Sequence, residues 1–475
     1  MKIIKKDLSE ISTHKYGRMD YKYWNTCEAV KFKSYFLLKD MFELINGSVQ
    51  TSNYVTEKTS IPYIRIGDID YKYGLSTEES IYLDADIDIS DEKLLKKYDL
   101  VLATIGATVG KIGLADKAVG GIHSNNTVVL RPKDKTINIR YYEKLFQTDF
   151  YINYIFGLVA QKAQPNLQPY EIENIRIPII DEAVQQKCME EVQSIELKIE
   201  ALKKKIKSKK TIMDEVFIKE FHLDYKTMME IDKMKIFNRE LSEITVRNSN
   251  VRNSCRWNKA VQIQNCLCKS TECVKLGKYI ITTKNGWSPS CSEYGEYQVL
   301  GLNAINSNGT LSFDNPKFSS EKKSNLSEFF IKNGDFFVSR GNTVDLVSMA
   351  SVASVETDTP STIYPDLMIR IKFSKDVDVH YMAYIFNSFI GRLYFKYSTK
   401  GKNQTMVKVS PYELSEFLVP LPDIEKQKKI VKKINKEVET QQTLRKEMNQ
   451  YRAQIDKLVT KSFSCKIAKS CKYKK

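Results

Sequence analysis

The 475-residue chain lacks the motifs on which several common protein classes depend. No Walker A loop is present, and no glycine-rich nucleotide-binding fingerprint follows a predicted strand. Histidine occurs only four times, and none of the four has a Ser or Cys partner in a known nucleophile motif. No apolar run approaches the roughly 18 residues that a membrane span needs. These absences favour a binding protein over an enzyme or a membrane protein.

The nine cysteines have no regular spacing. Cys266, Cys268 and Cys273 form a C-x-C-x4-C pattern, with Cys255 upstream, but a structural zinc site usually has paired knuckles and this segment has no second one. The first residues, MKIIKKDLSE, contain no apolar stretch typical of a signal peptide. We therefore expect free thiols, no bound metal and a cytoplasmic location.

The charge balance is basic. Lys and Arg number 74 against 58 Asp and Glu, which gives a formal net charge of +16. Nucleic acid is the first partner that such a balance indicates, because phosphate contacts supply most of the sequence-independent affinity. A lysine-rich composition bias is the alternative explanation of the same charge.

Two weak patterns bear on enzymatic alternatives, and one of them keeps an alternative open. The tetrad DNPK at 314–317 lacks the second Pro and the aromatic residue of the amino-methyltransferase motif, so we do not expect the chain to methylate by itself. Asp314, Glu321 and Lys323 have a D-x6-E-x-K spacing that a metal-dependent nuclease could use. Such a pattern arises readily by chance in a sequence that is 28% charged. A Mg-dependent nuclease remains one alternative function.

The chain contains a long internal repeat. Residues 170–221 align without a gap to residues 412–463, at a constant offset of 242. A repeat unit of this length indicates one large module used twice, not a solenoid. The identical positions in the first copy are Tyr170, Glu171, Pro178, Asp181, Gln185, Lys187, Leu202, Lys204, Asp214, Lys219 and Phe221.

Each copy continues as a predicted long helix that no Pro or Gly interrupts. Apolar positions step by three and four, as in the seam of a coiled coil. Two seams of equal length most simply pack on each other, and an antiparallel pair would relate the two halves by an approximate two-fold axis. The lysine run KKKIKSKK at 203–210 is expected on the surface of the first helix. The seam residues are Val192, Ile195, Ile199, Leu202, Ile206, Lys209, Met213 and Val216, then Ile434, Glu437, Gln441, Leu444, Met448, Tyr451, Ile455 and Leu458.

The segments upstream of the helices read as two related mixed α/β domains. Residues 36–47 parallel 274–286, 61–74 parallel 295–309, and 98–115 parallel 334–350, all as short strands with Gly or Asn turns. One helix is predicted at 139–156 and one at 379–395. The fold class is therefore mixed α+β: two α/β domains separated by two long antiparallel coiled-coil helices.

Polar joints connect each globular part to its helix, at 160–171 and 399–413. Gln and Asn can contact adenine edges and Lys can reach phosphate, although ordinary connecting loops would have the same composition. Further polar candidates lie in predicted turns. The candidate DNA-binding residues are Lys162, Gln164, Asn166, Lys400, Lys402, Asn403 and Gln404 at the joints, with Arg65, Arg340 and Asn342 in the turns.

The joint sequences IRIPIIDEAVQQK (175–187) and FLVPLPDIEKQKKIV (417–431) resemble those of the DNA-specificity subunit of type I restriction–modification enzymes. The resemblance extends from about residue 30 to 463 and includes AQPNL at 163–167. The first copy departs from the usual form at Ile180, Ala183 and Val184, and NQTMV at the second joint is looser.

The resemblance implies that each globular part is a target recognition domain for one half of a split DNA site. The helices would set the spacing and dock two modification subunits. These bring S-adenosylmethionine, and a restriction subunit would bring ATP and Mg. A helix of about 36 residues spans roughly 54 Å, enough for successive major grooves about 34 Å apart. The expected domains are 1–165 and 226–405, with helical spacers at 166–225 and 406–475. Beside the specificity subunit and the Mg-dependent nuclease, a non-catalytic coiled-coil scaffold is the third possible function.

Overall fold

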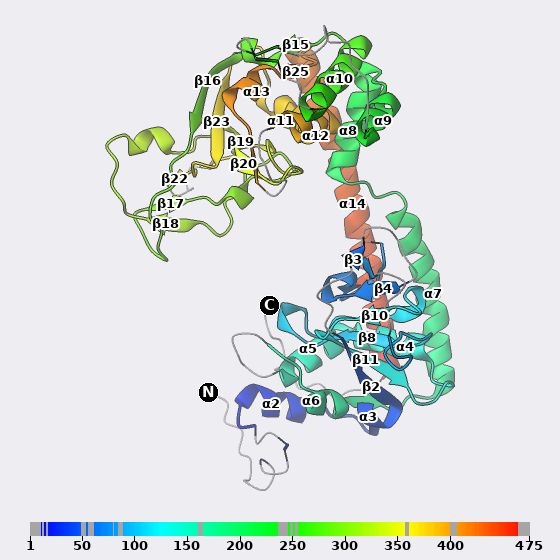
Figure 1. Ribbon diagram of the computed structural model, residues 1–475. Coiled ribbons are helices and arrows are strands. Elements are labelled where there is room, and N and C mark those ends of the chain that lie inside the picture. Colours follow the sequence, from blue (N-terminus) through cyan, green and yellow to red (C-terminus); the bar gives the residue numbers. More distant parts are fainter. Residues whose placement is uncertain are drawn as a thin grey trace. The chain divides into compact units, whose positions relative to one another are not determined.

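The computed structural model describes residues 11, 14–15, 18–48, 54–55, 61–78, 80–83, 89–159, 165–235, 246–247, 250–251, 255–356, 361–399 and 406–463. The chain divides into two compact units (Figure 1). Unit 1 comprises Met1–Lys205 and Arg445–Lys475, and unit 2 comprises Ile206–Leu444. Each unit thus contains one globular part and helical residues from both spacers. The domain limits given above remain a prediction.

Unit 1 is built on a four-stranded antiparallel sheet in the order β2-β11-β8-β9. All four residues of the central strand β8 are buried, as expected for a strand covered on both faces. A second sheet has the order β10-β4-β7-β3, in which β10 runs parallel to β4. The strands are β1 (Tyr35–Leu37), β2 (Phe42–Asn46), β3 (Tyr54–Val55), β4 (Ile61–Ile64), β5 (Ile69–Asp70), β6 (Gly74–Leu75), β7 (Ile81–Leu83), β8 (Leu100–Ala103), β9 (Ile112–Leu114), β10 (Ile122–His123), β11 (Thr127–Pro132) and β12 (Arg176–Pro178).

Unit 2 repeats this topology. Its main sheet has the order β16-β23-β19-β21, again antiparallel throughout, and in its second sheet β22 runs parallel to β17. The predicted equivalence of the strand segments in the two globular parts is therefore confirmed. The strands are β13 (Val246–Arg247), β14 (Asn250–Val251), β15 (Val274–Lys275), β16 (Ile280–Asn285), β17 (Tyr297–Val299), β18 (Lys317–Ser319), β19 (Phe336–Ser339), β20 (Gly341–Asn342), β21 (Ala350–Val352), β22 (Thr362–Ile363), β23 (Met368–Phe373), β24 (Val407–Lys408) and β25 (Leu418–Val419).

Helices pack against the sheets in both units and complete the hydrophobic cores. The helices of unit 1 are α2 (Tyr21–Ala29), α3 (Leu38–Met41), α4 (Ile139–Phe146), α5 (Asp149–Leu158), α6 (Pro169–Glu173) and α7 (Glu182–Lys203). Those of unit 2 are α8 (Lys209–Phe221), α9 (Tyr225–Lys233), α10 (Cys255–Ser270), α11 (Val379–Asn387), α12 (Phe389–Ser398) and α13 (Pro411–Ser415). The last helix, α14 (Ile424–Ser462), begins in unit 2 and ends in unit 1.

The single helices predicted at 139–156 and 379–395 are wrong, because each segment forms two helices. Thr148 separates α4 from α5, and its hydroxyl accepts a hydrogen bond from Tyr151 N at 3.3 Å. Ser388 separates α11 from α12 with an extended backbone. Thr and Ser favour this position because their side chains satisfy backbone groups at a helix terminus.

The first spacer also differs from its prediction. Figure 1 shows α14 as one continuous helix, whereas α7 and α8 are separate helices joined by residues 204–208. The lysine run at 203–210, expected on the surface of one helix, thus lies at a break between two helices. Like charges at helical spacing repel one another, which disfavours a continuous helix here. The break is also held by specific bonds: Ser208 Oγ accepts from Thr211 N at 3.0 Å, and Lys207 N donates to Gln441 Oε1 at 2.8 Å.

Within each unit the two spacer segments run antiparallel. In unit 1, Lys198 Nζ lies 5.6 Å from the ring centre of Tyr451, and Cys188 packs in the same core cluster as Val459. In unit 2, Lys433 Nζ lies 2.6 Å from Glu220 Oε1. Of the predicted seam, Glu437 is exposed, and Val459, outside the seam, is fully buried. The buried seam residues are Val192, Ile195, Ile199, Leu202, Met213, Val216, Ile434, Gln441 and Met448; Ile206, Lys209, Leu444, Tyr451, Ile455 and Leu458 are half-buried.

Two pairs of identical repeat positions make identical contacts. Asp214 Oδ1 accepts a hydrogen bond from Phe389 N, the first residue of α12, at 2.7 Å. Asp456 Oδ1 accepts from Asp149 N, the first residue of α5, also at 2.7 Å. Each carboxylate therefore caps the N-terminus of a helix in a globular part, where negative charge is favourable.

The second pair fixes the start of each spacer helix. Gln185 Nε2 donates to Ile180 O at 3.0 Å, and Gln427 Nε2 donates to Pro422 O at 2.7 Å. Gln427 is fully buried and also joins its helix to the globular part, because its Oε1 accepts from Asp378 N at 2.9 Å. Internal repetition therefore extends from sequence to individual hydrogen bonds.

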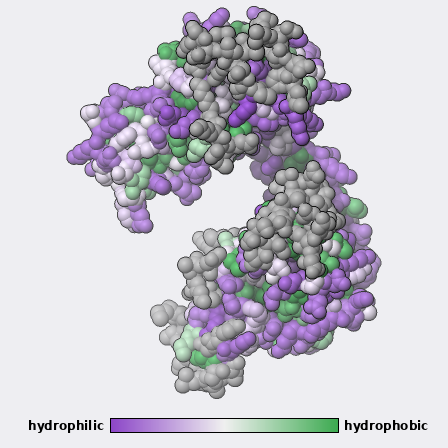
Figure 2. All heavy atoms as spheres, viewed as in Figure 1, coloured by the Kyte–Doolittle hydropathy of each residue, from purple (hydrophilic) through white to green (hydrophobic). Residues whose placement is uncertain are grey.

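Hydrophilic residues cover most of the surface visible in Figure 2, with small hydrophobic areas between them. Among the described helices, none is both long and apolar enough to cross a membrane.

Candidate nucleic-acid interface

In unit 1 the joint pairs with the end of the central strand. Asn166 forms an isolated antiparallel bridge with Ile105, two residues after β8. Leu167 N donates to Thr104 O at 2.9 Å, and Gly106 N donates to Pro165 O at 2.8 Å. The main chain of residues 165–167 is thus fixed at the edge of the unit where β8 ends.

Unit 2 has the same arrangement at the same repeat positions. β20 pairs with β24 so that Gly341 lies opposite Lys408, just as Ile105 lies opposite Asn166 in unit 1. Val409 N donates to Arg340 O at 2.9 Å, just as Leu167 bonds the residue after β8. The joint and the loop after the central strand therefore form one polar edge in each unit, which we call the joint edge.

The loop between β10 and β11, residues 124–126, reaches the same edge. In unit 1, Ser124 N donates to Ile64 O at 2.9 Å and Thr104 N donates to Asn126 O at 3.0 Å. This loop places Asn125, which is exposed, and Asn126, which is half-buried, beside the joint edge. Neither was predicted, although the pair Asn-Asn between two short strands is a recognisable turn signal.

Close backbone approach at this loop requires glycine in both units. An added Cβ at Gly47 would lie 2.0 Å from Ser124 O, and one at Gly286 would lie 2.2 Å from Pro365 O. Both glycines directly follow the edge strand of the main sheet, β2 or β16. The same steric requirement therefore accounts for glycine at positions 47 and 286.

Three of the predicted candidates lie in these paired segments. Asn166, Arg340 and Asn342 are half-buried, and Asn342 Oδ1 accepts a hydrogen bond from Thr343 N at 2.8 Å. Arg65 follows β4, and its side chain is 43% exposed with Nε 3.9 Å from Asp68 Oδ2. The structure therefore brings Arg340 and Asn342 together with the second joint and Asn166 with the loop after β8. The candidates outside the described residues are Lys162, Gln164, Lys400, Lys402, Asn403 and Gln404.

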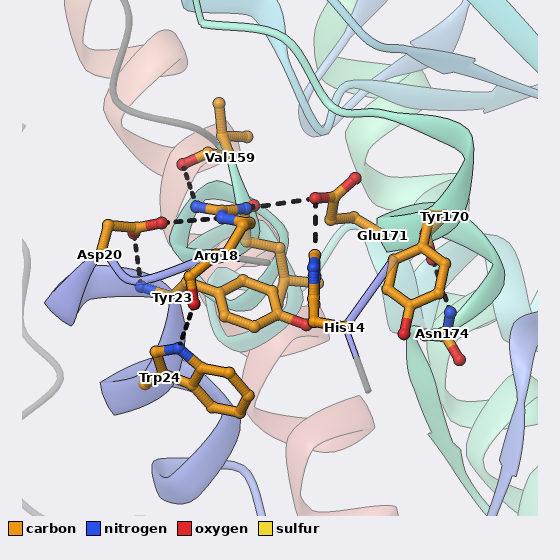
Figure 3. Close-up of polar contacts among 10 residues, drawn as sticks. His14, Arg18, Asp20, Tyr23, Trp24, Val159, Tyr170, Glu171 and Asn174 are labelled. Carbon is orange, nitrogen blue, oxygen red and sulfur yellow. Dashed lines mark hydrogen bonds and ion pairs between the residues drawn. The ribbon is translucent and has the colours of Figure 1, made fainter. Parts of the chain in front are cut away.

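A buried ionic cluster holds both ends of the first joint. Arg18, 9% exposed, donates to the carbonyl oxygens of Leu158 and Val159, which precede the joint. Its Nη1 lies 3.3 Å from Oε1 of Glu171, the last residue of the joint. Figure 3 shows Arg18 between Val159 and Glu171. A single guanidinium thus connects the end of α5 with α6.

This cluster takes the place of a cap that unit 2 has. Glu413, the repeat equivalent of Glu171, accepts from Ser410 N at 3.0 Å, but Gln168 occupies the position of Ser410 in the first copy. Burial raises the pKa of Glu171, and Arg18 opposes that shift. His14 Nε2 lies 4.0 Å from Glu171 Oε1, and burial lowers its pKa (Figure 3). The carboxylate is thus held mainly by Arg18.

The residues considered for a nuclease centre have other partners. Asp314 Oδ2 accepts from Ser312 Oγ at 2.7 Å, and Glu321 Oε2 accepts from Ser290 N at 2.7 Å. Lys323 Nζ lies 4.6 Å from the ring centre of Trp287. Over the ranges that the structure describes, no group of three His, Cys, Asp or Glu side chains could hold a metal ion. Cys268 and Cys273 are free thiols, and both are half-buried.

Comparison with known proteins finds a family model that matches part of the chain. Residues 30–209 match the family model described as Type I restriction modification DNA specificity domain. No curated protein sequence matches the chain. This matched segment contains the main sheet of unit 1, its joint and α7.

Three solved structures are similar over most of the chain. The type I restriction–modification S subunit from M. genitalium is 13% identical, covers 92% of this chain and 96% of its own, and has a TM-score of 0.38. The HsdS subunit from Thermoanaerobacter tengcongensis is 14% identical over 90% and 96%, with a TM-score of 0.32. A structure described under complex assembly and conformational transition of the type I R-M system is 14% identical over 91% and 98%, with a TM-score of 0.44. Residues 30–209 of this chain are therefore similar to the type I restriction–modification DNA specificity domain.

Proposed function

We propose that the chain is the DNA-specificity subunit of a type I restriction–modification complex, with two target recognition domains for a bipartite site. One observation carries the proposal. The domain that matches the specificity family recurs in unit 2 with the same sheet order, the same joint pairing and the same helix caps. A second copy of a DNA-recognition domain fits recognition of a second half-site.

The joint edge is the proposed DNA-contacting surface of each domain. Asn and Arg side chains can form paired hydrogen bonds with adenine and guanine in the major groove, and lysines at the joints can reach phosphates. The net charge of +16 supports the nonspecific part of that affinity. Asn166 would serve the first domain, and Arg340 with Asn342 the second.

The spacer helices would set the distance between half-sites and dock two modification subunits. These subunits would bind S-adenosylmethionine and methylate adenine, and a restriction subunit would use ATP and Mg. The specificity chain itself would be non-catalytic and cytoplasmic. Chain connections between the units occur only at Lys205–Ile206 and Leu444–Arg445, so a change in spacing must alter both.

The test is co-expression with a modification subunit encoded beside the gene, followed by methylome sequencing. A complex of two modification subunits per specificity chain and a split methylated-adenine motif would support the proposal. A chain that remains alone and leaves no methylation motif would refute it.

Matched variants then assign the half-sites. Asn342→Ala should relax base preference in one half-site and Asn166→Ala in the other, each by about 1–3 kcal/mol of discrimination. Loss of preference in both half-sites from either single change would contradict the separate roles of the two domains.

A further inference from the structure

A charged cavity lies within unit 1, where the turn between β5 and β6 meets α4, α7 and α14. Its volume is about 260 Å³. Pockets for drug-sized ligands are roughly 300–1,000 Å³, so this one suits a smaller molecule. Its acidic lining residues are Asp116, Glu143, Glu196, Glu200 and Asp456, and its basic ones are Lys72, Lys117, Arg140, Lys144, Lys203 and Arg452.

Two of the cations already have carboxylate partners. Lys144 Nζ lies 2.8 Å from Glu196 Oε1 and 3.5 Å from Glu143 Oε2. Lys72 Nζ lies 3.7 Å from Asp456 Oδ1. These contacts engage three of the five acidic side chains. Over the whole lining, six basic side chains stand against five acidic ones.

Four further cations line the cavity beside two further carboxylates of the lining, and outside the lining Asp70 acts on Arg452 and Glu78 on Lys203. Among the described residues, none of these four has a carboxylate oxygen within 4.0 Å of its charged nitrogen atoms. The four are Lys117, Arg140, Lys203 and Arg452, and the two carboxylates are Asp116 and Glu200.

Arg452 has the least satisfied polar group of the cavity. Its guanidinium lies over the ring of Tyr73, and its buried Nε and Nη2 atoms have no hydrogen-bond partner within the described part of the chain. The N–H groups of Nε and Nη2 point the same way and form the edge that binds a carboxylate or a phosphate through two parallel hydrogen bonds. Lys203 Nζ lies 4.5 Å from the same ring centre, so both cations meet at Tyr73.

The accumulated charge is unfavourable without a counter-ion. Burial lowers the pKa of Lys203; Glu200 and Glu78 oppose this shift, and repulsion from Lys117 and Lys144 adds to it. Burial also lowers the pKa of Arg452 to about 10, although Asp70 opposes the shift. An anion in the cavity would relieve both the repulsion and the missing acceptors.

We propose that this cavity is a binding site for a small phosphate monoester dianion, held by the Nε–Nη2 edge of Arg452 and by the ammonium group of Lys203. Its negative charge is opposite to that of the four cations, and its oxygens would supply the acceptors that Arg452 Nε and Nη2 lack. A monoester also has three terminal oxygens, which suffices for Arg452, Lys203 and one further cation. The site is separate from the joint edge, so it does not rest on the proposed function.

The test is calorimetric titration of the full-length protein at constant ionic strength with methyl phosphate and with dimethyl phosphate. Methyl phosphate is a monoester dianion, whereas dimethyl phosphate carries one charge and mimics a DNA backbone phosphate. We expect saturable binding of methyl phosphate and binding of dimethyl phosphate that is at least about tenfold weaker. Equal binding of the two would overturn the assignment to a monoester.

Three variants locate the binding. Arg452→Gln should weaken methyl phosphate binding at least about tenfold, and Lys203→Gln, a change at an exposed lysine, should weaken it about three- to tenfold. Arg445→Gln removes an exposed cation of α14 that does not line the cavity, and it should leave binding unchanged.

Two results would overturn the proposal: absence of saturable binding in the unaltered protein, or equal losses in Lys203→Gln and Arg445→Gln. DNA binding by the Lys203→Gln protein should stay unchanged, because the cavity is distinct from the joint edge. A loss of DNA affinity in that variant would instead assign the cavity to backbone phosphate.

Discussion

The carboxylates of Asp214 and Asp456 should each stabilise one unit and leave the other unaffected. The perturbation is Asp214→Ala, compared with Asp456→Ala as its repeat-matched partner. The Asp214 side chain is 12% exposed and accepts from Phe389 N at the start of α12, whereas the Asp456 side chain is 23% exposed and accepts from Asp149 N at the start of α5. Each change removes one cap and leaves one backbone N–H without its acceptor.

The exposure of the two sites decides the magnitudes. A hydrogen bond to a charged group contributes about 1.5–3 kcal/mol, and a buried donor that loses its acceptor costs about 1–3 kcal/mol. Asp214→Ala should therefore cost about 2–3 kcal/mol, or roughly a 30- to 150-fold larger opening equilibrium at the start of α12. Water can replace the more exposed Asp456, so its removal should cost about 1 kcal/mol, or roughly fivefold.

Hydrogen–deuterium exchange of the full-length protein, followed by peptide mass spectrometry, would measure both effects. Asp214→Ala should speed exchange in peptides that cover α12, and Asp456→Ala in those that cover α5. Asp214→Asn keeps an acceptor and loses only the charge, so it should cost about 0.3–1 kcal/mol. Faster exchange in α5 after Asp214→Ala, or unchanged exchange in α12, would refute the assignment of α8 to unit 2.

Three further predictions concern unit 1 and its match in unit 2. Burial lowers the pKa of His123 to about 4, so between about pH 6.5 and 4 the unfolded chain binds more protons than the folded one. The free energy of unfolding should therefore fall by up to about 3 kcal/mol as pH falls through that window. His123→Gln should flatten the pH profile of the unfolding midpoint. Arg18→Met leaves Glu171 buried without its cation and should destabilise unit 1 by about 3–5 kcal/mol, measured by denaturant unfolding, with Arg18→Met/Glu171→Gln recovering part of the loss. Gly47→Ala and Gly286→Ala should each destabilise their own unit by more than about 2 kcal/mol, measured by local exchange, because the added Cβ meets a backbone carbonyl; a neutral effect at either glycine would contradict the close approach.

Much of the fold could be predicted because one chain contains two copies of it. Alignment of FLLKDMFELING with VKLGKYIITTKNG already located Gly47 and Gly286 at the ends of matching strands. A further match was available and was missed: KKYD at 96–99 and KNGD at 332–335 form the same turn, in which Asp99 N donates to Lys96 O and Asp335 N donates to Lys332 O.

The helix breaks could not be read from periodicity. A three-four pattern of apolar residues continues through residues 204–208, although the helix does not. The competing effects are the like charges of the lysine run and a bond from Lys207 N to a side chain of a segment more than 200 residues away. The first effect is visible in the sequence, but its outcome depends on the second, which exists only in the folded protein.

The site was predictable only in part for a similar reason. Composition indicated the joints, and the structure places Asn166, Arg340 and Asn342 beside the ends of central strands. Asn125 and Asn126 reach the same edge through strand pairing between β4 and β10, which no local pattern in the sequence reports. Tertiary pairing, not local composition, decides which turns share an edge.

The identical residues of the repeat have a physical explanation that also limits how the chain can be divided. Asp214 belongs to the first copy but caps a helix of the second globular part, and Asp456 belongs to the second copy but caps a helix of the first. Phe463 follows the same rule, because it packs in the unit 1 core beside Phe32 and Phe150. A segment chosen by composition, such as residues 1–165, therefore leaves part of its own core on α14. Exchange of the globular part of unit 1 must keep these α14 contacts, because they belong to the folded unit even though they lie at the other end of the sequence.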